Sequence, residues 1–164
     1  MSGTELRAFV GVGANLGDAQ STVRQALRAL GGLAGCRLGA CSSLYRTAPL
    51  QSQGPDFVNA VAELFATVDA LALLRGLQDI EHSFGHVRSV RNAPRTLDLD
   101  LLLYGQKVLQ TDELVLPHPR AHLRAFVLVP LAEIDATIVL PGRGALGPWL
   151  QCAAHQPIER IDLA

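Results

Sequence analysis

Two aspartates spaced one residue apart are the side chains of this chain best suited to chemistry. Asp98 and Asp100 lie in the apolar segment 97–104. On a β-strand successive side chains point to opposite faces, so the two carboxylates would share one face. The alternating leucines of the segment would share the other face: Leu97, Leu99, Leu101 and Leu103.

The spacing of this pair suits magnesium. The rise of a strand would put the Cβ atoms of Asp98 and Asp100 about 6 to 7 Å apart. Carboxylates at that distance can share one Mg²⁺, or hold two Mg²⁺ ions about 3.5 to 4 Å apart, as in two-metal phosphoryl-transfer sites. Oxygen ligands favour magnesium over zinc. The pair therefore predicts a site for metal and polyphosphate.

Cationic residues precede the pair. No acidic residue occurs between Glu81 and Asp98, where the basic side chains are His82, His86, Arg88, Arg91 and Arg95. Guanidinium groups bind phosphate oxygens in a bidentate manner. Gly85 and Pro94 favour a loop that closes over a nucleotide. The alternative is a merely solvated surface, but a cationic segment directly before two carboxylates on an apolar strand favours a ligand site.

A second segment without acidic residues, 116–126, could form the other wall of the phosphate site. Its basic side chains are His118, Arg120, His122 and Arg124. A zinc site is disfavoured in both segments. The pairs His118/His122 and His82/His86 have i, i+4 spacing, but both lack the intervening glutamate and are interrupted by proline or glycine.

A third segment predicts a pocket for a flat ring. In 57–64, strand alternation directs four apolar side chains to the core: Val58, Ala60, Ala62 and Leu64. Phe57 and Asn59 then share the other face with Val61 and Glu63. An aromatic ring beside an amide offers stacking and paired hydrogen bonds to a nitrogen heterocycle. The alternative is an aromatic cover over the sheet and an asparagine at a turn.

Length and composition indicate one domain, over residues 1–164. The chain has 164 residues, of which 49% are hydrophobic and 18% charged. This length is enough for one well-buried core and too short for two ordinary domains. A net charge of −1 disfavours a general binder of nucleic acid or anionic membranes. The three cysteines show no disulfide or metal pattern, and neither a signal peptide nor a membrane span is evident. These features predict a cytoplasmic protein with reduced cysteines.

The order of the expected elements defines the fold class. Alternation predicts strands over 6–12, 37–45, 57–67 and 97–104, and helical spacing predicts helices ending at Leu30 and over 71–84. The order β-α-β-β-α-β is that of a ferredoxin-like α+β sandwich with a mainly antiparallel sheet.

The remaining segments are less distinctive. The glycine-rich segment 11–17 is interpreted as a strand exit, because its spacing does not fit a dinucleotide-binding turn. A C-terminal extension is expected to contain a short strand through Val108, an apolar run over 125–134 whose type stays open, and a helix over 146–154.

Five sequence motifs, spread over nearly the whole chain, resemble those of one known family. They are residues 12–17, 45–50, 56–60, 91–102, and 116–120 with 124–126. Their content and order resemble the 6-hydroxymethyl-7,8-dihydropterin pyrophosphokinase family, and the Arg-Thr-Leu-Asp-Leu-Asp block at 95–100 is highly specific. Enzymes of this family transfer pyrophosphate from ATP to a pterin alcohol in folate biosynthesis. The resemblance implies the same activity, with two Mg²⁺ ions and ATP as co-substrate. We expect small-molecule substrates, no nucleic-acid or membrane partner, and a monomer.

The resemblance also implies residue roles. Asp98 and Asp100 would bind the metal ions and, with Arg88 and Arg95, form the catalytic set. ATP would be held by Gln78, Glu81, Arg88, Arg95, Leu101, His118 and Arg124. The pterin would be held by Thr47, Pro49, Leu50, Phe57, Asn59 and Phe126, with the two phenylalanine rings on either side of it. Taken alone, Gln78 and Glu81 look like solvated helix residues.

The implied reaction is an in-line attack of the pterin hydroxymethyl oxygen on the β-phosphorus of ATP, with AMP as the leaving group. Three departures from some family members affect the expected closing loop. His86 replaces an arginine, Asn92 replaces a tryptophan, and the segment 85–94 is slightly shorter. Because His86 is only partly charged near neutral pH, Arg88 and Arg95 would supply more of the charge stabilisation.

Two functions of other classes compete with this one. A nucleotidyl-transferase or cyclase palm domain would use the same metals on another acceptor and release pyrophosphate instead of AMP, and it would leave the pocket beside Phe57 and Asn59 unexplained. A non-catalytic ligand-binding module would not consume ATP in the presence of Mg²⁺.

Overall fold

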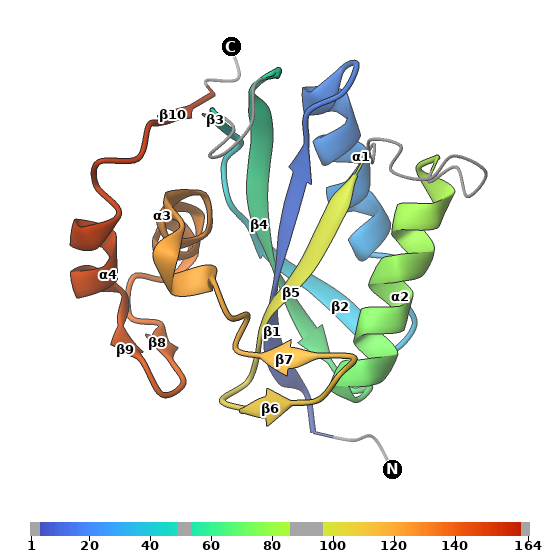
Figure 1. Cartoon of the computed structure of the whole chain (residues 1–164). Helices are drawn as coiled ribbons and strands as arrows, with labels where there is room; N and C mark the ends of the chain where they lie inside the picture. The colour runs from blue at the N-terminus through green and yellow to red at the C-terminus, as the bar shows by residue number, and fades with distance from the viewer. Residues whose placement is uncertain (1–3, 49–53, 86–96, 162–164) are drawn as a thin grey trace.

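The central element of the fold is an antiparallel sheet in the strand order β10-β3-β4-β1-β5, with β2 also paired to β4 (Figure 1). The structure is a computed structural model and describes residues 4–48, 54–85 and 97–161. The long strands are β1 (Leu6–Ala14), β4 (Phe57–Ala66) and β5 (Asp98–Tyr104). The expected α+β class and mainly antiparallel sheet are confirmed.

Helices cover both faces of the sheet (Figure 1). One face is covered by α1 (Ala19–Leu30) and α2 (Ala70–Ser83), the other by α3 (Ala125–Ile134) and α4 (Leu146–Cys152). The first two helices begin after aspartates, Asp18 and Asp69. Their carboxylates accept hydrogen bonds from backbone N–H groups three residues later, at 3.1 and 2.8 Å. These caps satisfy donors that the helix itself leaves unpaired.

The two helical layers create two hydrophobic cores. The core under α1 and α2 contains the alternating residues expected from β4: Val58, Ala60, Ala62 and Leu64. The core under α3 and α4 contains Val61 of the same strand, together with Leu128 and Leu131 of α3. The face of β4 that carries Phe57 and Asn59 is therefore also covered, which buries Asn59 to 6% exposure.

The expected strand 37–45 is two strands. These are β2 (Cys36–Cys41) and β3 (Tyr45–Thr47), both antiparallel to β4. Between them the Ser42 backbone N–H donates to the Val61 carbonyl at 2.8 Å, and the Ser42 hydroxyl accepts from the Val61 N–H at 2.9 Å. A side chain thus replaces a backbone acceptor and interrupts the ladder, which alternation alone does not predict.

The outer strand β5 contains a bulge. Phe9 of β1 pairs with Leu103, but Val10 pairs with Leu101, so Leu102 is the extra residue. Leu102 and Leu103 both pack into the core under α3 and α4. The expectation that Leu103 shares the face of the other alternate leucines is therefore wrong, because the bulge reverses the alternation. The aspartate pair precedes the bulge and keeps its shared face.

The C-terminal part completes the second layer. The apolar run 125–134 is α3, and it is apolar around most of its circumference because it lies between the sheet and α4 (Figure 1). The expected short strand is present but does not include Val108, which is 65% exposed. The strand β6 (Leu109–Gln110) begins one residue later and pairs with β7 (Val115–Leu116).

Short elements in this part are a 3₁₀ turn (Ala121–Leu123) and the paired strands β8 (Val139–Leu140) and β9 (Gly144–Ala145). The last strand, β10 (Ile158–Arg160), pairs with β3. The three cysteines are free. Within the ranges that the structure describes, no helix has the length and apolarity needed to cross a membrane.

An ion-pair network joins β1, β4 and the end of α3. The guanidinium of Arg7 donates to Glu63 from Nε and to Asp135 from Nη1, the latter at 2.8 Å. Glu63 is 7% exposed and also accepts from the Ala40 N–H at 3.0 Å. Hydrogen bonds from Thr137 and the nearby Arg7 lower the pKa of Asp135 to about 2. Asp135 is therefore ionised in the folded protein down to low pH.

This network predicts an acid-dependent term in stability. A carboxylate whose pKa is lower in the folded than in the unfolded state stabilises fully above its unfolded pKa, about 4, and loses that effect as pH falls further. We expect Asp135→Asn to be less stable than the wild type at pH 6, and the difference to shrink as pH falls from about 4 toward 2. Urea unfolding of both proteins across this range measures it. A difference independent of pH would contradict the assignment.

Candidate functional site

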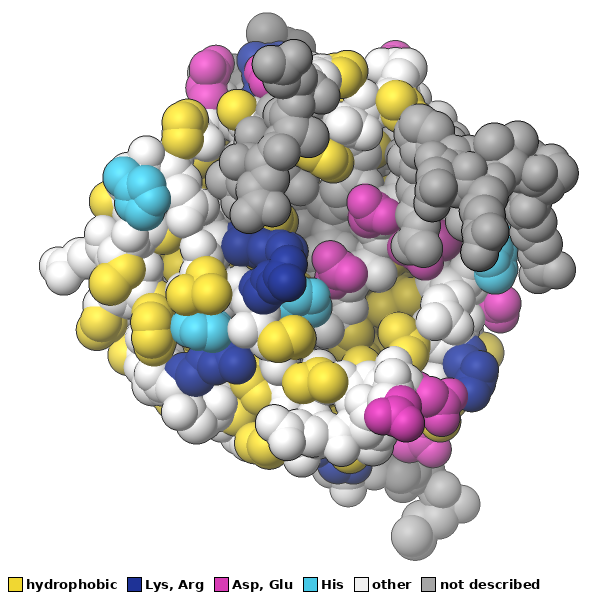
Figure 2. All heavy atoms as spheres, in the orientation of Figure 1, with side chains coloured by type: hydrophobic (Ala, Val, Ile, Leu, Met, Phe, Trp, Pro, Cys, Tyr) yellow, Lys and Arg dark blue, Asp and Glu magenta, His cyan; other side chains and the backbone are white. Residues whose placement is uncertain are grey.

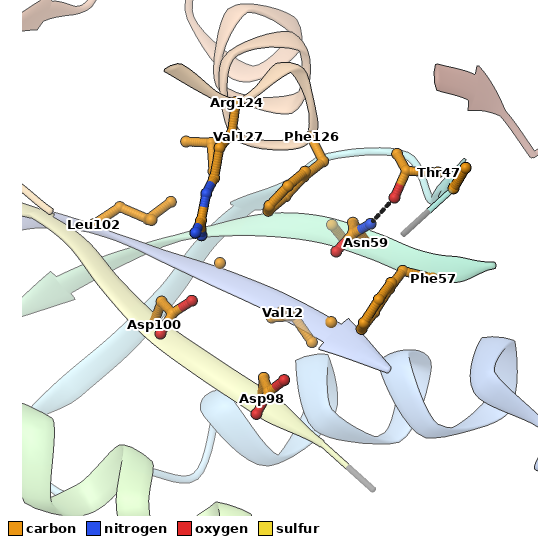
Figure 3. Close-up of a pocket in the computed structure, with 14 residues that line it drawn as sticks. Val12, Thr47, Phe57, Asn59, Asp98, Asp100, Leu102, Arg124, Phe126 and Val127 are labelled. Atoms are coloured by element: carbon orange, nitrogen blue, oxygen red, sulfur yellow. Dashed lines mark hydrogen bonds between the residues drawn. The ribbon is translucent and has the colours of Figure 1, made fainter. Parts of the chain in front are cut away.

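A cavity of about 250 Å³ lies between the sheet and the start of α3. Its walls come from β1, β3, β4 and β5, and from Arg124, Phe126 and Val127 at the beginning of the helix. Figure 3 shows Asp98 and Asp100 at one end of this cavity and Asn59 with two aromatic rings at the other. One space thus contains the predicted carboxylate pair and the predicted ring pocket.

Glycines form part of the cavity floor. On β1, Gly11 pairs with Asp100 and Gly13 pairs with Asp98. Because these glycines have no side chains, the strand next to the carboxylates leaves space above it. The interpretation of segment 11–17 as a strand exit applies to Gly17, which follows β1 and has a φ of +58°. It misses Gly11 and Gly13, which lie within the strand and line the cavity.

The polar group at the ring end is held in a fixed orientation. The Asn59 side-chain Nδ2 donates to the Thr47 hydroxyl at 2.7 Å, and both residues are 6% exposed. Asn59 also lies beside Gly13 of β1. A Cβ atom built on Gly13 would be 2.9 Å from Asn59 Oδ1. The asparagine amide is therefore confined by the Thr47 hydroxyl on one side and by Gly13 on the other.

Two phenylalanines border the same end. Phe57 comes from β4 and Phe126 from α3, and both are half-buried cavity residues. In Figure 3 the two rings project into the space beside Asn59 from these different elements. The faces of aromatic rings bind flat ligands by stacking. This end of the cavity can accept a planar heterocycle with hydrogen-bonding edges.

The other end of the cavity is charged. Asp98 is half-buried and Asp100 is exposed. Arg124 precedes α3 and extends toward the Asp100 side of the cavity (Figure 3), and its guanidinium carbon lies 5.3 Å from the centre of the Phe126 ring. Acidic side chains on this face border a hollow across from basic ones (Figure 2). The arrangement offers binding groups both for cations and for phosphate oxygens.

His118 lies next to this charged end. Its backbone N–H donates to the Leu102 carbonyl of β5 at 2.9 Å. Burial lowers the pKa of His118, and the nearby Arg124, Arg120 and Arg143 lower it as well, although Asp100 acts in the opposite direction. Arg143 was not predicted from the sequence. It donates to the His118 carbonyl at 3.0 Å, a contact between segments that no local pattern signals.

Three other predicted residues lie outside the cavity lining. Glu81, near the end of α2, accepts a hydrogen bond from the Leu99 N–H at 2.8 Å, so it attaches the helix to β5. Gln78 is exposed on α2. The side chain of Leu101 is 3% exposed and packs into the core under α1 and α2, away from the cavity. Other predicted residues lie outside the described ranges: Pro49, Leu50, Arg88 and Arg95, together with residues 86–94 of the expected closing loop.

The carboxylate pair fits a hard cation. Asp98 and Asp100 share one face of β5 and both line the cavity. No cluster of three or more histidine, cysteine, aspartate or glutamate side chains suited to a metal occurs in the described part of the chain. Two carboxylates leave coordination positions for water and phosphate, which is how Mg²⁺ is commonly held in nucleotide-dependent enzymes. The donor set therefore fits magnesium better than a metal that needs a closed protein cage.

Comparison with known proteins gives a consistent result. A model of the 7,8-dihydro-6-hydroxymethylpterin-pyrophosphokinase (HPPK) family matches residues 9–136. The chain is 43% identical over 156 residues to a 2-amino-4-hydroxy-6-hydroxymethyldihydropteridine pyrophosphokinase of Haemophilus influenzae, covering 94% of this chain and 98% of that protein. The Pseudomonas aeruginosa protein of the same name is 41% identical over 156 residues, covering 94% and 96%.

Solved structures support the fold. A crystal structure of HPPK-DHPS in complex with substrates superposes with a TM-score of 0.69 at 13% identity, covering 90% of this chain and 43% of that one. Plasmodium falciparum wild-type HPPK-DHPS with pteroate gives a TM-score of 0.69 at 12% identity, covering 92% and 43%. From the family match and the close relatives, the chain belongs to the HPPK family and is an ATP-dependent pyrophosphokinase of folate biosynthesis.

Proposed function

We propose that this protein transfers the β,γ-diphosphate of ATP to the hydroxymethyl group of 6-hydroxymethyl-7,8-dihydropterin by in-line attack at the β-phosphorus, within the cavity between the sheet and α3. The observation that carries the proposal is the continuity of that cavity. One end offers two aromatic rings and an oriented amide, and the other offers two carboxylates and an arginine. A pterin alcohol and a polyphosphate would meet where these two ends join.

The reaction balances as a single displacement. A bond forms between the pterin hydroxymethyl oxygen and the β-phosphorus, and the bond between that phosphorus and the oxygen bridging it to the α-phosphorus breaks. The bridging oxygen leaves with AMP, and the proton of the alcohol is released to solvent. Positioning and electrostatic stabilisation supply most of the catalysis in such transfers.

The residues divide between the two substrates. Asn59, oriented by Thr47, would hydrogen-bond the edge of the pterin, and Phe57 and Phe126 would stack on its faces. Arg124 and His118 would bind phosphate oxygens. Pro49 and Leu50 on the pterin side belong to the same proposal, as do the ATP residues Gln78, Glu81, Arg88, Arg95 and Leu101, the last through its backbone.

Asp98 and Asp100 would hold two Mg²⁺ ions. When bound, the ions would neutralise phosphate charge and make the attacking hydroxyl a better nucleophile. The two carboxylates would hold the ions on one face of β5, next to Gly11 and Gly13 of β1. Arg124 reaches the same region from the opposite wall (Figure 3). These residues would stabilise the transferring group from two sides.

We further propose that residues 1–164 form one domain that acts as a cytoplasmic monomer on small molecules, without a nucleic-acid or membrane partner. The net charge of −1 and the packing of both helical layers on one sheet support this. Sedimentation of the purified protein measures the oligomeric state directly, and a stable dimer at assay concentrations would correct this part of the proposal.

The test is a chromatographic assay of purified protein with ATP, Mg²⁺ and 6-hydroxymethyl-7,8-dihydropterin. We expect AMP and pterin diphosphate to appear in equal amounts, and chelation of Mg²⁺ to stop both. Release of pyrophosphate without AMP would instead indicate a nucleotidyl-transferase or cyclase. Binding of both ligands without any turnover would indicate a ligand-binding module.

A further inference from the structure

We propose that Gln156 is a positioning residue for the substrates, acting through the backbone at the start of α3, which carries Arg124 and Phe126. The inference rests on the proposed function, because it assumes that Arg124 binds phosphate and that Phe126 stacks on the pterin. Gln156 does not line the cavity. It also lies beyond residues 9–136, which the family model matches.

One side chain holds the backbone on both sides of Arg124. The Gln156 Oε1 atom accepts from the Ala125 N–H at 2.9 Å, and its Nε2 group donates to the Leu123 carbonyl at 2.8 Å. The two bonds use both functions of the amide, which only asparagine and glutamine provide together at neutral charge. The peptide groups before and after Arg124 are thereby fixed relative to the segment that contains Gln156.

The start of α3 needs such a partner. Arg124 occupies the N-cap position with φ −119° and ψ 120°, and it makes no side-chain capping bond. An arginine has only donors and cannot accept from the first N–H groups of the helix. Those N–H groups otherwise have no partner within the helix. Gln156 therefore caps α3 from a distant part of the chain.

The capped turn controls two cavity residues at once. The Arg124 guanidinium carbon lies 5.3 Å from the centre of the Phe126 ring, and both side chains reach the cavity from this turn (Figure 3). A small rotation of the turn would move the phosphate-binding cation and the stacking ring together. Catalytic rates are sensitive to displacements of this size.

Gln156 is itself anchored on both sides. Its N–H donates to the Ala153 carbonyl at 3.0 Å, and Ala153 is 4% exposed. Two residues later, Ile158 of β10 pairs with Thr47 of β3, the partner of Asn59. The C-terminal segment thus runs from α4 past the start of α3 to β3 (Figure 1). This segment therefore contacts both α3, which carries Phe126, and β3, whose Thr47 orients the Asn59 amide.

The decisive variant is Gln156→Met, which keeps an unbranched side chain of similar length and removes both hydrogen bonds. The matched control is Gln151→Met on the exposed side of α4. We expect Gln156→Met to lower kcat/KM about tenfold. Binding of an unreactive ATP analogue and binding of the pterin, measured separately, should both be weaker than in the wild type. The thermal midpoint should stay within about 3 °C of the wild type, and Gln151→Met should match the wild type in every measurement.

A second variant and a double-mutant cycle separate positioning from general stability. Gln156→Glu keeps an acceptor for the Ala125 N–H but replaces the donor to the Leu123 carbonyl with an oxygen, so it too should weaken binding of the ATP analogue, although the side chain keeps its shape. In an Arg124→Ala background, Gln156→Met should weaken binding of the ATP analogue by less than about twofold, because interactions in one network are not additive.

The inference is overturned if Gln156→Met matches Gln151→Met in an active wild-type background. It is also overturned if Gln156→Met weakens binding of the ATP analogue equally with and without Arg124. Losses of activity that simply follow the drop in thermal midpoint would have the same meaning, since both results indicate a structural role only. Failure of the proposed function has a different signature, namely a wild-type protein that forms neither AMP nor pterin diphosphate.

Discussion

Asp100→Asn is expected to lower kcat for AMP formation about a thousandfold or more while the protein remains folded. Asp100 is exposed and lines the charged end of the cavity, so the substitution removes a charge without emptying any core. A metal site that neutralises the transferring phosphate contributes several kcal/mol to catalysis, which corresponds to at least three orders of magnitude in rate. Asp98→Asn should behave similarly, because its carboxylate shares the same face of β5.

The measurements are AMP formation over a series of Mg²⁺ concentrations, pterin binding by calorimetry, and thermal unfolding. The variants should bind the pterin normally, because Asn59 and the aromatic rings lie at the other end of the cavity (Figure 3). Asp112→Asn is the control, since Asp112 is an exposed carboxylate in the turn between β6 and β7 and does not line the cavity. Turnover within a few-fold of the wild type for both cavity variants would contradict the metal assignment.

Gly13→Ala is expected to weaken pterin binding about 10- to 100-fold. The added Cβ would lie 2.9 Å from Asn59 Oδ1, so the amide must shift and its 2.7 Å bond to Thr47 must lengthen or break. Disturbing one buried, oriented hydrogen-bonding group costs about 1 to 3 kcal/mol, which is about 5- to 160-fold in affinity and brackets the expected loss. Binding of an ATP analogue in the absence of pterin should change little.

Two comparisons make this prediction specific. The atoms nearest to a Cβ built on Gly11 belong to the Leu102 side chain, at 3.5 Å, which is an ordinary contact distance. Gly11→Ala should therefore lose less pterin affinity than Gly13→Ala. In an Asn59→Ala background the clash no longer exists, so Gly13→Ala should have almost no further effect. Full additivity of the two substitutions would show that Gly13 acts by another route.

Part of this site could be predicted from the sequence, because the alternation of side chains along a strand depends only on neighbouring residues. The period of two placed both aspartates on one face of β5 and separated Phe57 and Asn59 from the core residues of β4, and the structure agrees. Side-chain chemistry then suggested a metal and a flat heterocycle. The resemblance to one family joined these separate predictions into a single reaction.

Other features depend on contacts between distant segments. The bulge at Leu102 and the break at Ser42 arise from pairing with β1 and β4, and alternation within one strand carries no information about its neighbour's register. Taken alone in the sequence, Glu81 looks like a solvated helix residue, whereas in the structure its carboxylate accepts a hydrogen bond from the Leu99 N–H. That bond exists only because α2 packs beside the edge of β5.

The sequence by itself determined which residues have the chemistry: two carboxylates on a strand, an amide beside an aromatic ring, and basic segments on either side. The tertiary structure decided which of them share a cavity and how they are held there. Gly13 on β1 confines Asn59 on the neighbouring strand β4. Gln156 caps the turn that carries Arg124, although it lies 31 residues after its hydrogen-bond partner Ala125. Residue type and local spacing are encoded one segment at a time, whereas orientation is fixed by hydrogen bonds and packing that form only when distant segments meet.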